Sequence, residues 1–260
     1  MAFMRADQNT NDPGVWLEAM NWLEAETVLN DASVIVIPLG SAAKEHGPHL
    51  PLNNDALIAN WLAREVAQRL PVVIAPLINT SYYPAFTDYP GSLSLRAETA
   101  RDLMVDTCRS LAAFGVEKFY VLNTGVSTEV PLSLAGVILR AEELRFEYLK
   151  LAEVFSGLDS KTFEQQYGSH ADEHETSLML HIVPEAVDMS KVVDDGFEGE
   201  GKLSRVRGEG IWSESGVYGQ ATLASAGKGK LVAAALVECA VRDILRLINF
   251  HPLPRGRGQG

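Results

Sequence analysis

Short, almost continuous apolar runs alternate along this chain with longer amphipathic stretches. The runs VIVIPL at 34–39, VVIAPL at 72–77 and FYVLN at 119–123 have the composition of strands buried on both faces. Between them, the apolar spacing predicts helices over about 55–70 and 96–114. Strands of this kind separated by helices predict an α/β fold, a layered α/β/α arrangement with a mostly parallel central sheet.

The second half of the chain continues this rhythm. We expect a strand over about 146–151 and helices over about 130–144, 175–182 and 229–248. The polar N-terminal residues 1–13 and the tail 251–260 are expected to be disordered, which leaves residues 14–250 as a single α/β domain.

Composition narrows the class of function. A chain of 260 residues with 47% hydrophobic residues can bury a sizeable core, as a globular enzyme does. Its net charge of −12 disfavours a nucleic-acid partner, because phosphate binding depends on clustered Lys and Arg. Neither a membrane-spanning run nor a signal peptide is evident, so we expect no membrane partner and a cytoplasmic location. A small-molecule substrate is the expectation that remains.

Polar, chemically active residues directly follow the first strand. The loop 38–55 contains Lys44, Glu45, His46, His49 and Asp55. In open α/β sheets, ligands bind beyond the carboxyl ends of the strands, so a stiff, histidine-bearing loop there predicts an active site. The alternative is a surface loop whose histidines have no function.

A second cluster lies more than a hundred residues further on. The segment GSHADEHETSLMLH at 168–181 contains His170, His174 and His181 together with Asp172, Glu173 and Glu175. Five of the six histidines therefore fall in two short segments. Imidazole and carboxylate groups suit zinc, manganese or iron, and a catalytic site typically takes about three protein ligands. The two segments could supply such a set.

Three other segments are candidates for contact with a substrate. The loop 79–94, which includes Tyr83, is rich in aromatic residues and could form the wall of a pocket or simply pack on the core. Asn123, Thr124 and Ser127 follow a strand and could bind a substrate or cap the next helix. The segment 190–220, rich in Gly, Glu and Ser, could be a lid or an arm between subunits.

Several motifs together resemble the creatininase (creatinine amidohydrolase) family. The motifs are Gly40-Ser41, the run Glu45-His46-Gly47-Pro48-His49-Leu50-Pro51-Leu52 with Asp55, Pro90-Gly91-Ser92, His170-Ala171, Glu175-Thr176-Ser177, and Gly216 with Gly219 before Thr222-Leu223-Ala224. The resemblance covers most of the chain. It implies a layered creatininase-like α/β domain, assembly into a homo-oligomer such as a hexamer, and metal-dependent hydrolysis of amide C–N bonds in small, often cyclic, molecules.

The chain departs from the family pattern at two metal ligands. Lys44 stands where the family usually has a glutamate, and Gly125 stands where it usually has a histidine. Both losses affect the same metal position, so the resemblance implies at most one divalent ion, whether zinc, manganese or iron. His46 and Asp55 match ligands of the other position, and Glu175 is the expected third ligand.

The resemblance also suggests roles for the remaining residues near this metal. Glu45 could replace the lost ligand by a shift of one residue. Lys44 could place its ammonium where the second cation would lie and so hold Asp55 or polarise a carbonyl. His170 could donate a proton to a leaving nitrogen, or form only a supporting hydrogen bond. Glu173 could act as a general base or hold His170, or be a solvated acid at a helix start.

The first functional hypothesis is therefore a one-metal amidohydrolase that cleaves a C–N bond in a small cyclic amide, imide or formamide. A metal ion held by His46, Asp55 and Glu175 would lower the pKa of a bound water from about 15.7 towards 7. The second hypothesis is a creatininase-like binding or structural subunit without catalytic activity. A third is a metal-assisted isomerase, dehydratase or lactonase.

Overall fold

The computed structural model describes residues 12–158, 162–196 and 199–250. The expected disorder of residues 1–11 and 251–260 lies outside these ranges. The strands are β1 (Val15–Trp16), β2 (Val34–Leu39), β3 (Val73–Ile74), β4 (Lys118–Asn123), β5 (Arg145–Tyr148), β6 (Asp194–Asp195), β7 (Leu203–Ser204), β8 (Ile211–Trp212) and β9 (Gly219–Gln220). The α-helices are α1 (Trp22–Val28), α2 (Asn54–Ala67), α3 (Ala97–Ala112), α4 (Glu129–Ala141), α5 (Leu151–Ser156), α6 (Glu173–Ile182) and α7 (Ala226–Ile248).

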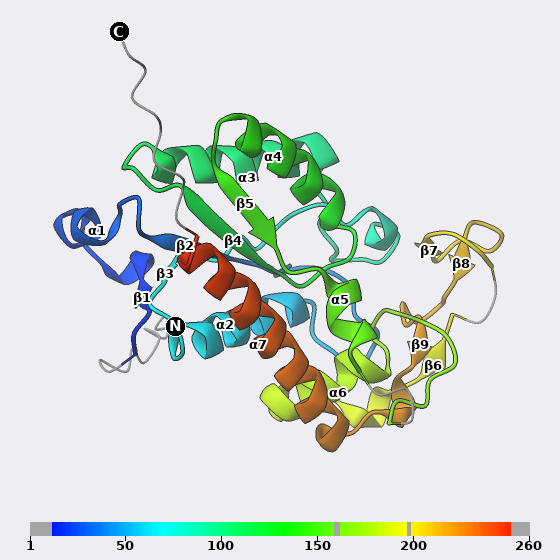
Figure 1. Ribbon diagram of the computed structural model, residues 1–260. Helices are drawn as coiled ribbons and strands as arrows, with labels where there is room; N and C mark the ends of the chain where they lie inside the picture. Colours follow the sequence, from blue (N-terminus) through cyan, green and yellow to red (C-terminus); the bar gives the residue numbers. More distant parts are fainter. Residues whose placement is uncertain (1–11, 159–161, 197–198, 251–260) are drawn as a thin grey trace, which may run out of the picture.

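The centre of the molecule is a five-stranded sheet in the order β1-β3-β2-β4-β5 (Figure 1). Every pairing in this sheet is parallel. The longest ladder joins β2 to β4, from Val34 opposite Lys118 to Leu39 opposite Asn123. Both strands are buried along their whole length, as their apolar runs predict. The predicted α/β fold is confirmed.

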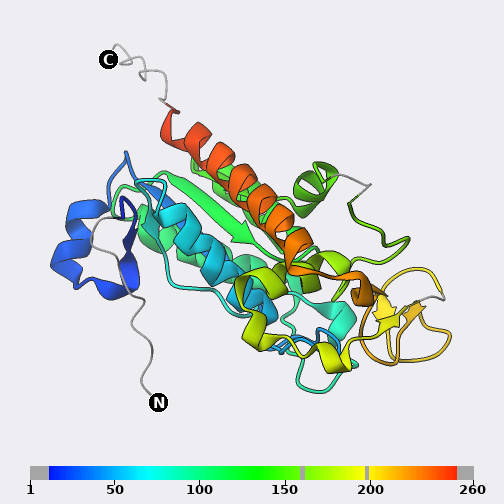
Figure 2. The ribbon, with the colours of Figure 1, turned by 90° about the horizontal axis from the view of Figure 1, so that it is seen from below.

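Helices cover both faces of the sheet because alternate residues of each strand point to opposite sides. Val34 and Val36 join the core beneath α2 and α7, while Ile35 and Ile37 join a second core beneath α3 and α4. Seen from below, α2 and α7 cross the same face of the sheet (Figure 2). The result is the three-layer arrangement expected from the sequence.

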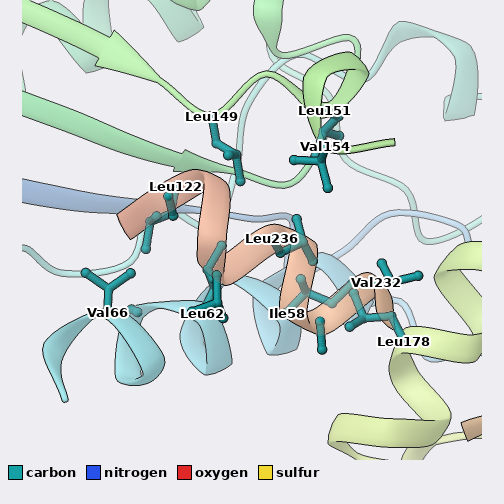
Figure 3. Packing of buried hydrophobic residues seen from close by; sticks show 14 of the residues in the cluster. Ile58, Leu62, Val66, Leu122, Leu149, Leu151, Val154, Leu178, Val232 and Leu236 are labelled. Atoms are coloured by element: carbon teal, nitrogen blue, oxygen red, sulfur yellow. The ribbon is translucent and has the colours of Figure 1, made fainter. Parts of the chain in front are cut away.

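The larger core lies between the sheet, α2 and α7. Leu62 of α2 and Leu122 of β4 are fully buried, and Leu236 of α7 approaches them from the facing helix (Figure 3). Burial of an aliphatic side chain of this size contributes roughly 1.5–3 kcal/mol, so this cluster is a main source of stability. It also fixes α2, whose first turn carries Asp55.

A close helix contact holds α6 in place. Helix α7 begins after Ser225, whose hydroxyl accepts a hydrogen bond from the Lys228 amide. A side chain at Gly229 would collide with the carbonyl of Ser177, so glycine lets the two helices approach. This helix starts three residues before the expected residue 229, because the helix-disfavouring Gly227 and Gly229 obscure its first turn in the sequence.

The segment 190–220 folds back on its own chain. It contains the antiparallel pair β6–β9 and the parallel pair β7–β8. Leu203 and Ile211 pack with Tyr83, Phe86 and Tyr89 of the aromatic loop 79–94, and Tyr89 donates a hydrogen bond to the Ser213 carbonyl. Within the described chain, this segment therefore supports the aromatic loop.

Other predicted elements differ in their bounds. The strand expected over 146–151 ends at Tyr148, and Leu151 begins the short helix α5. The strand expected over 72–77 is reduced to Val73–Ile74. Among the described residues, we find no helix with the length and apolar character needed to cross a membrane.

Candidate active site

The two histidine segments predicted from the sequence meet beyond the carboxyl ends of the central strands. The loop that follows β2 carries His46, and the residues just before α6 carry His170. Their rings lie 4.9 Å apart, centroid to centroid. Residues more than a hundred positions apart thus form one buried cluster, at the edge of the sheet where α/β proteins bind ligands.

His46 is fully buried and its hydrogen bonds fix its orientation. Nδ1 lies 2.8 Å from the Lys44 carbonyl, which can only accept, so this nitrogen carries a proton. Nε2 faces two carboxylates, 2.8 Å from Asp55 Oδ1 and 3.4 Å from Glu175 Oε1. Burial and the Lys44 ammonium lower the pKa of His46, but the two carboxylates outweigh them and raise it to about 9. Nε2 is therefore placed to hold either a proton or a cation.

His170 is oriented in the same manner. Its Nε2 lies 2.9 Å from the Glu45 carbonyl, so Nε2 carries the proton and Nδ1 presents a lone pair. Nδ1 faces Glu175 Oε2 at 3.7 Å. The backbone of His170 is held by reciprocal hydrogen bonds with Tyr218, and its ring contacts Phe86 at 4.4 Å between centroids.

Glu175 is held by two donors. Asn54 Nδ2 donates to Oε1 at 3.0 Å, and the Ala171 amide donates to Oε2 at 2.8 Å. Ala171 adopts a φ of 47°, in the left-handed region, which turns its amide toward the carboxylate. Burial raises the pKa of Glu175, but His46, His170 and Lys44 together lower it by more. The pKa of Glu175 therefore lies well below its usual range.

Lys44 and Asp55 form a buried ion pair beside these groups. Lys44 Nζ lies 2.8 Å from Asp55 Oδ2, and the two side chains are 5% and 0% exposed. The ammonium also lies 4.8 Å from the ring centroid of Phe86 and 5.4 Å from that of Tyr83. Asp55 thus has one oxygen toward His46 and the other toward Lys44.

Glu45 and Glu173 have different surroundings. Glu45 accepts a hydrogen bond from the Gly47 amide and lies 3.2 Å from His170 Nε2 through Oε2, so it supports His170. A side chain at Gly216, where φ is +89°, would collide with this carboxylate. Glu173 is fully buried, pairs with Lys228 and accepts hydrogen bonds from the amides of residues 164 and 165.

The expectations for Glu173 were therefore wrong in two respects. Its carboxylate is not solvated, because the start of α6 packs beneath α7. Its described contacts are with Lys228 and the 164–165 backbone rather than with His170. Its position is that of a structural anchor for α6.

The other histidines within the described residues lie at the margin of the cluster or outside it. His49 Nε2 lies 2.8 Å from the Thr176 hydroxyl, and burial lowers the pKa of His49 to about 4. His174 stacks on Phe163 with centroids 4.4 Å apart, and His181 is exposed. His49 thus links the loop to α6.

The polar residues after β4 are engaged with the protein. Asn123 is fully buried and donates to the Gly125 carbonyl, while Thr124 donates to the Leu39 carbonyl and Ser127 to the Tyr82 carbonyl. Thr128 precedes α4 without a side-chain cap and donates to the Gly125 carbonyl instead. These contacts fix the loop between β4 and α4.

The donor set suits a divalent metal ion. Among the described residues, His46, His170 and Glu175 offer ligand atoms that all lie within 4.8 Å of one another. Both histidines donate their other ring N–H to a backbone carbonyl, which is the usual support of a metal-ligating imidazole. Next to this group the Lys44 ammonium holds Asp55, and an ammonium cannot coordinate a metal.

Sequence reasoning missed three contributors to the site. Asn54 and the Ala171 amide hold Glu175, and the ring of Phe86 lies against both His170 and Lys44. Asn54 precedes Asp55 on the first turn of α2, and its position was a usable signal. Nothing in the sequence marks a backbone amide, and Phe86 was one of several aromatic residues in its loop.

The chain has a parallel, layered α/β fold, and imidazole and carboxylate groups gather beyond the ends of its strands. These two features define an α/β protein with an enzyme-like site. Comparison with known proteins identifies the protein family. The family model for creatininase, creatinine amidohydrolase, matches residues 18–246. The chain belongs to the creatininase family.

Individual relatives agree with this assignment. The mycofactocin precursor peptide peptidase of Mycobacterium tuberculosis (strain H37Rv) is 32% identical over 240 residues, covering 85% of this chain and 87% of the relative. The creatinine amidohydrolase of Pseudomonas putida is 26% identical over 200 residues, covering 69% and 76%. A solved structure titled "Creatininase Mn" superposes with a TM-score of 0.76 at 23% identity, covering 91% of this chain and all of that one.

Proposed function

We propose that this protein is a one-metal amidohydrolase that cleaves a C–N bond in a small cyclic amide, imide or formamide. The broader class, a hydrolase of the creatininase family, follows from the family match and from relatives whose names describe hydrolytic activities. The number of metal ions, the ligand set and the substrate class are our proposals.

The observation that carries the proposal is the convergence of two prepared imidazoles on one carboxylate. His46 Nε2 and His170 Nδ1 both face Glu175, and the opposite nitrogen of each ring lies within 3 Å of a backbone carbonyl. These backbone acceptors fix His46 and His170 each in the tautomer that leaves the nitrogen facing Glu175 free to bind a ligand. We therefore assign His46, His170 and Glu175 as the ligands of zinc, manganese or iron, with Asp55 as the carboxylate adjacent to His46.

A divalent ion bound there would supply Lewis acidity and activate a water molecule at neutral pH. The protein's own groups prepare the surroundings. Asn54 and the Ala171 amide hold Glu175, and the Glu45 carbonyl holds His170. Asp55 can accept a proton from a reacting water through its oxygen nearer His46, while Lys44 keeps that carboxylate ionised at neutral pH.

The buried aromatic residues support a small substrate. Phe86 packs against His170, and Tyr83 lies beside Lys44, so two aromatic rings lie next to the charged groups. Apolar walls with a few fixed polar groups are typical of sites for small molecules. The carbonyl of an amide or imide bound in this site would lie near the Lys44 ammonium.

The test combines metal analysis with a substrate screen. The purified protein, incubated with zinc, manganese or iron and then desalted, is expected to retain about one equivalent and to hydrolyse at least one cyclic amide, imide or formamide. His46→Ala should lose both properties. His181→Ala, an exposed position on α6, is the matched control and should retain both.

Two outcomes would contradict the proposal. One is that no metal is retained under any of the three conditions, and the other is turnover that survives His46→Ala unchanged. Saturable binding of a cyclic amide without turnover would instead favour the alternative of a catalytically inactive binding subunit.

A homo-oligomer is also part of the proposal. The exposed apolar residues Val130, Leu134 and Val137 are spaced four and three residues apart on α4, so they lie along one side of the helix, and an exposed apolar patch is typical of an interface. Light scattering should give a multiple of 28.3 kDa, and Val130→Lys with Val137→Lys should reduce it. A monomer mass for the unaltered protein would contradict assembly.

A further inference from the structure

Lys44 is a charged side chain in an unusual place. It is 4% exposed, and its ion-pair partner Asp55 is fully buried. Lysine is almost never buried without a partner, and burial of an ion pair carries a large desolvation cost. A buried ammonium at the centre of a histidine and carboxylate cluster therefore needs a specific reason.

The surroundings of Nζ are those of a cation site. A carboxylate oxygen of Asp55 lies 2.8 Å away, and the rings of Phe86 and Tyr83 lie at 4.8 and 5.4 Å. Aromatic faces and carboxylates both attract cations. The backbone amide of Lys44 donates to the Leu52 carbonyl, so the loop presents the side chain from a fixed point.

The charges of the cluster indicate what this cation does. Three carboxylates, those of Glu45, Asp55 and Glu175, surround the two histidines. One ammonium and one divalent ion would neutralise them, with both imidazoles neutral. Without the ammonium, one divalent ion would leave a negative charge in a buried site, where unbalanced charge is costly.

We propose that Lys44 is a tethered cation, which occupies a cation position beside Asp55 and so limits the cluster to one exchangeable metal ion. This inference rests on the proposed function of the same site. Its consequence is that residue 44 sets the number of metal ions bound by the chain. A purely structural ion pair would have no such effect.

The test counts zinc in two variants. After zinc loading and desalting, the unaltered protein should retain one equivalent, whereas Lys44→Glu should retain two, because four carboxylates then require two divalent ions. Lys44→Gln should retain one equivalent with a zinc Kd about tenfold lower or better, since the repelling charge is gone. Lys230→Glu, an exposed position on α7, controls for the change in net charge.

The outcomes separate the two proposals. One equivalent in both the unaltered protein and Lys44→Glu, with an unchanged Kd in Lys44→Gln, would overturn the tethered cation and leave the one-metal site standing. No zinc in the unaltered protein but one equivalent in Lys44→Glu would overturn the one-metal site and support the tethered cation. No zinc in any variant would overturn both. If Lys44→Glu does not fold, the Kd of Lys44→Gln decides.

Discussion

Removal of the Lys228 ammonium should destabilise the protein strongly. Glu173 is fully buried at the start of α6, and Lys228 of α7 is its ion-pair partner. Lys228→Met would leave this carboxylate with two backbone donors and no cation. Loss of one partner of a buried pair costs about 3–5 kcal/mol, and we expect the lower end because the backbone amides remain. For a chain of this size, about 3 kcal/mol corresponds to a decrease in Tm of roughly 6–12 °C.

Urea unfolding followed by circular dichroism measures this change in the free energy of unfolding. Lys230→Met, an exposed position two residues further along α7, is the control and should change stability by less than about 0.5 kcal/mol. In the background of Glu173→Gln, Lys228→Met should cost much less than in the unaltered protein, because the buried charge is already gone.

A decrease of less than about 1 kcal/mol in the free energy of unfolding for Lys228→Met would refute this reasoning, since removal of the cation from a buried carboxylate should cost more than that. Strict additivity of the two substitutions would refute it as well. Either result would mean that α6 is held by its packing on α7 alone.

Three further predictions concern stability. Leu62→Ala should cost about 2–5 kcal/mol in urea unfolding, because Leu62 is fully buried between α2 and the sheet, whereas Leu231→Ala on the exposed side of α7 should have little effect. Ala171→Gly should raise the free energy of unfolding by up to about 1 kcal/mol, because glycine relieves the left-handed φ of 47°, and a loss of stability would contradict the strain. Burial raises the pKa of Asp195, but hydrogen bonds from Ser215, Gly196 and Ser213 outweigh it, so the pKa is lowered on folding. The contribution of Asp195 to stability is therefore present above the unfolded pKa of about 3.9 and is lost as the pH falls through the folded pKa. Asp195→Asn should for this reason weaken the dependence of Tm on acid pH. An unchanged dependence would argue against these hydrogen bonds.

The fold was largely predictable because its signals are local. The runs of β2 and β4 are nearly continuous apolar segments, and such segments only suit a sheet covered on both faces. The start of α7 was not predictable, because its first turn contains two glycines, and one of them, Gly229, is needed only for the close contact with α6. The short strands β7 and β8 are likewise stabilised by contacts with the distant aromatic loop.

The candidate site was predictable in composition but not in pairing. The sequence places His46 and Asp55 in one segment and His170 and Glu175 in another, and the structure brings all four together. The identity of the partners depends on side-chain direction. Asp55 turns one oxygen to Lys44, and Glu173 turns away to Lys228, because each nearby ammonium reaches its carboxylate from a different element.

The most direct test of the one-metal site is anomalous diffraction at the zinc absorption edge, from crystals of zinc-loaded protein. We predict one anomalous peak per chain, within coordination distance of His46 Nε2, His170 Nδ1 and Glu175, with Lys44 still paired to Asp55. A pair of peaks, or a peak in place of the Lys44 ammonium with His170 unligated, would contradict this account.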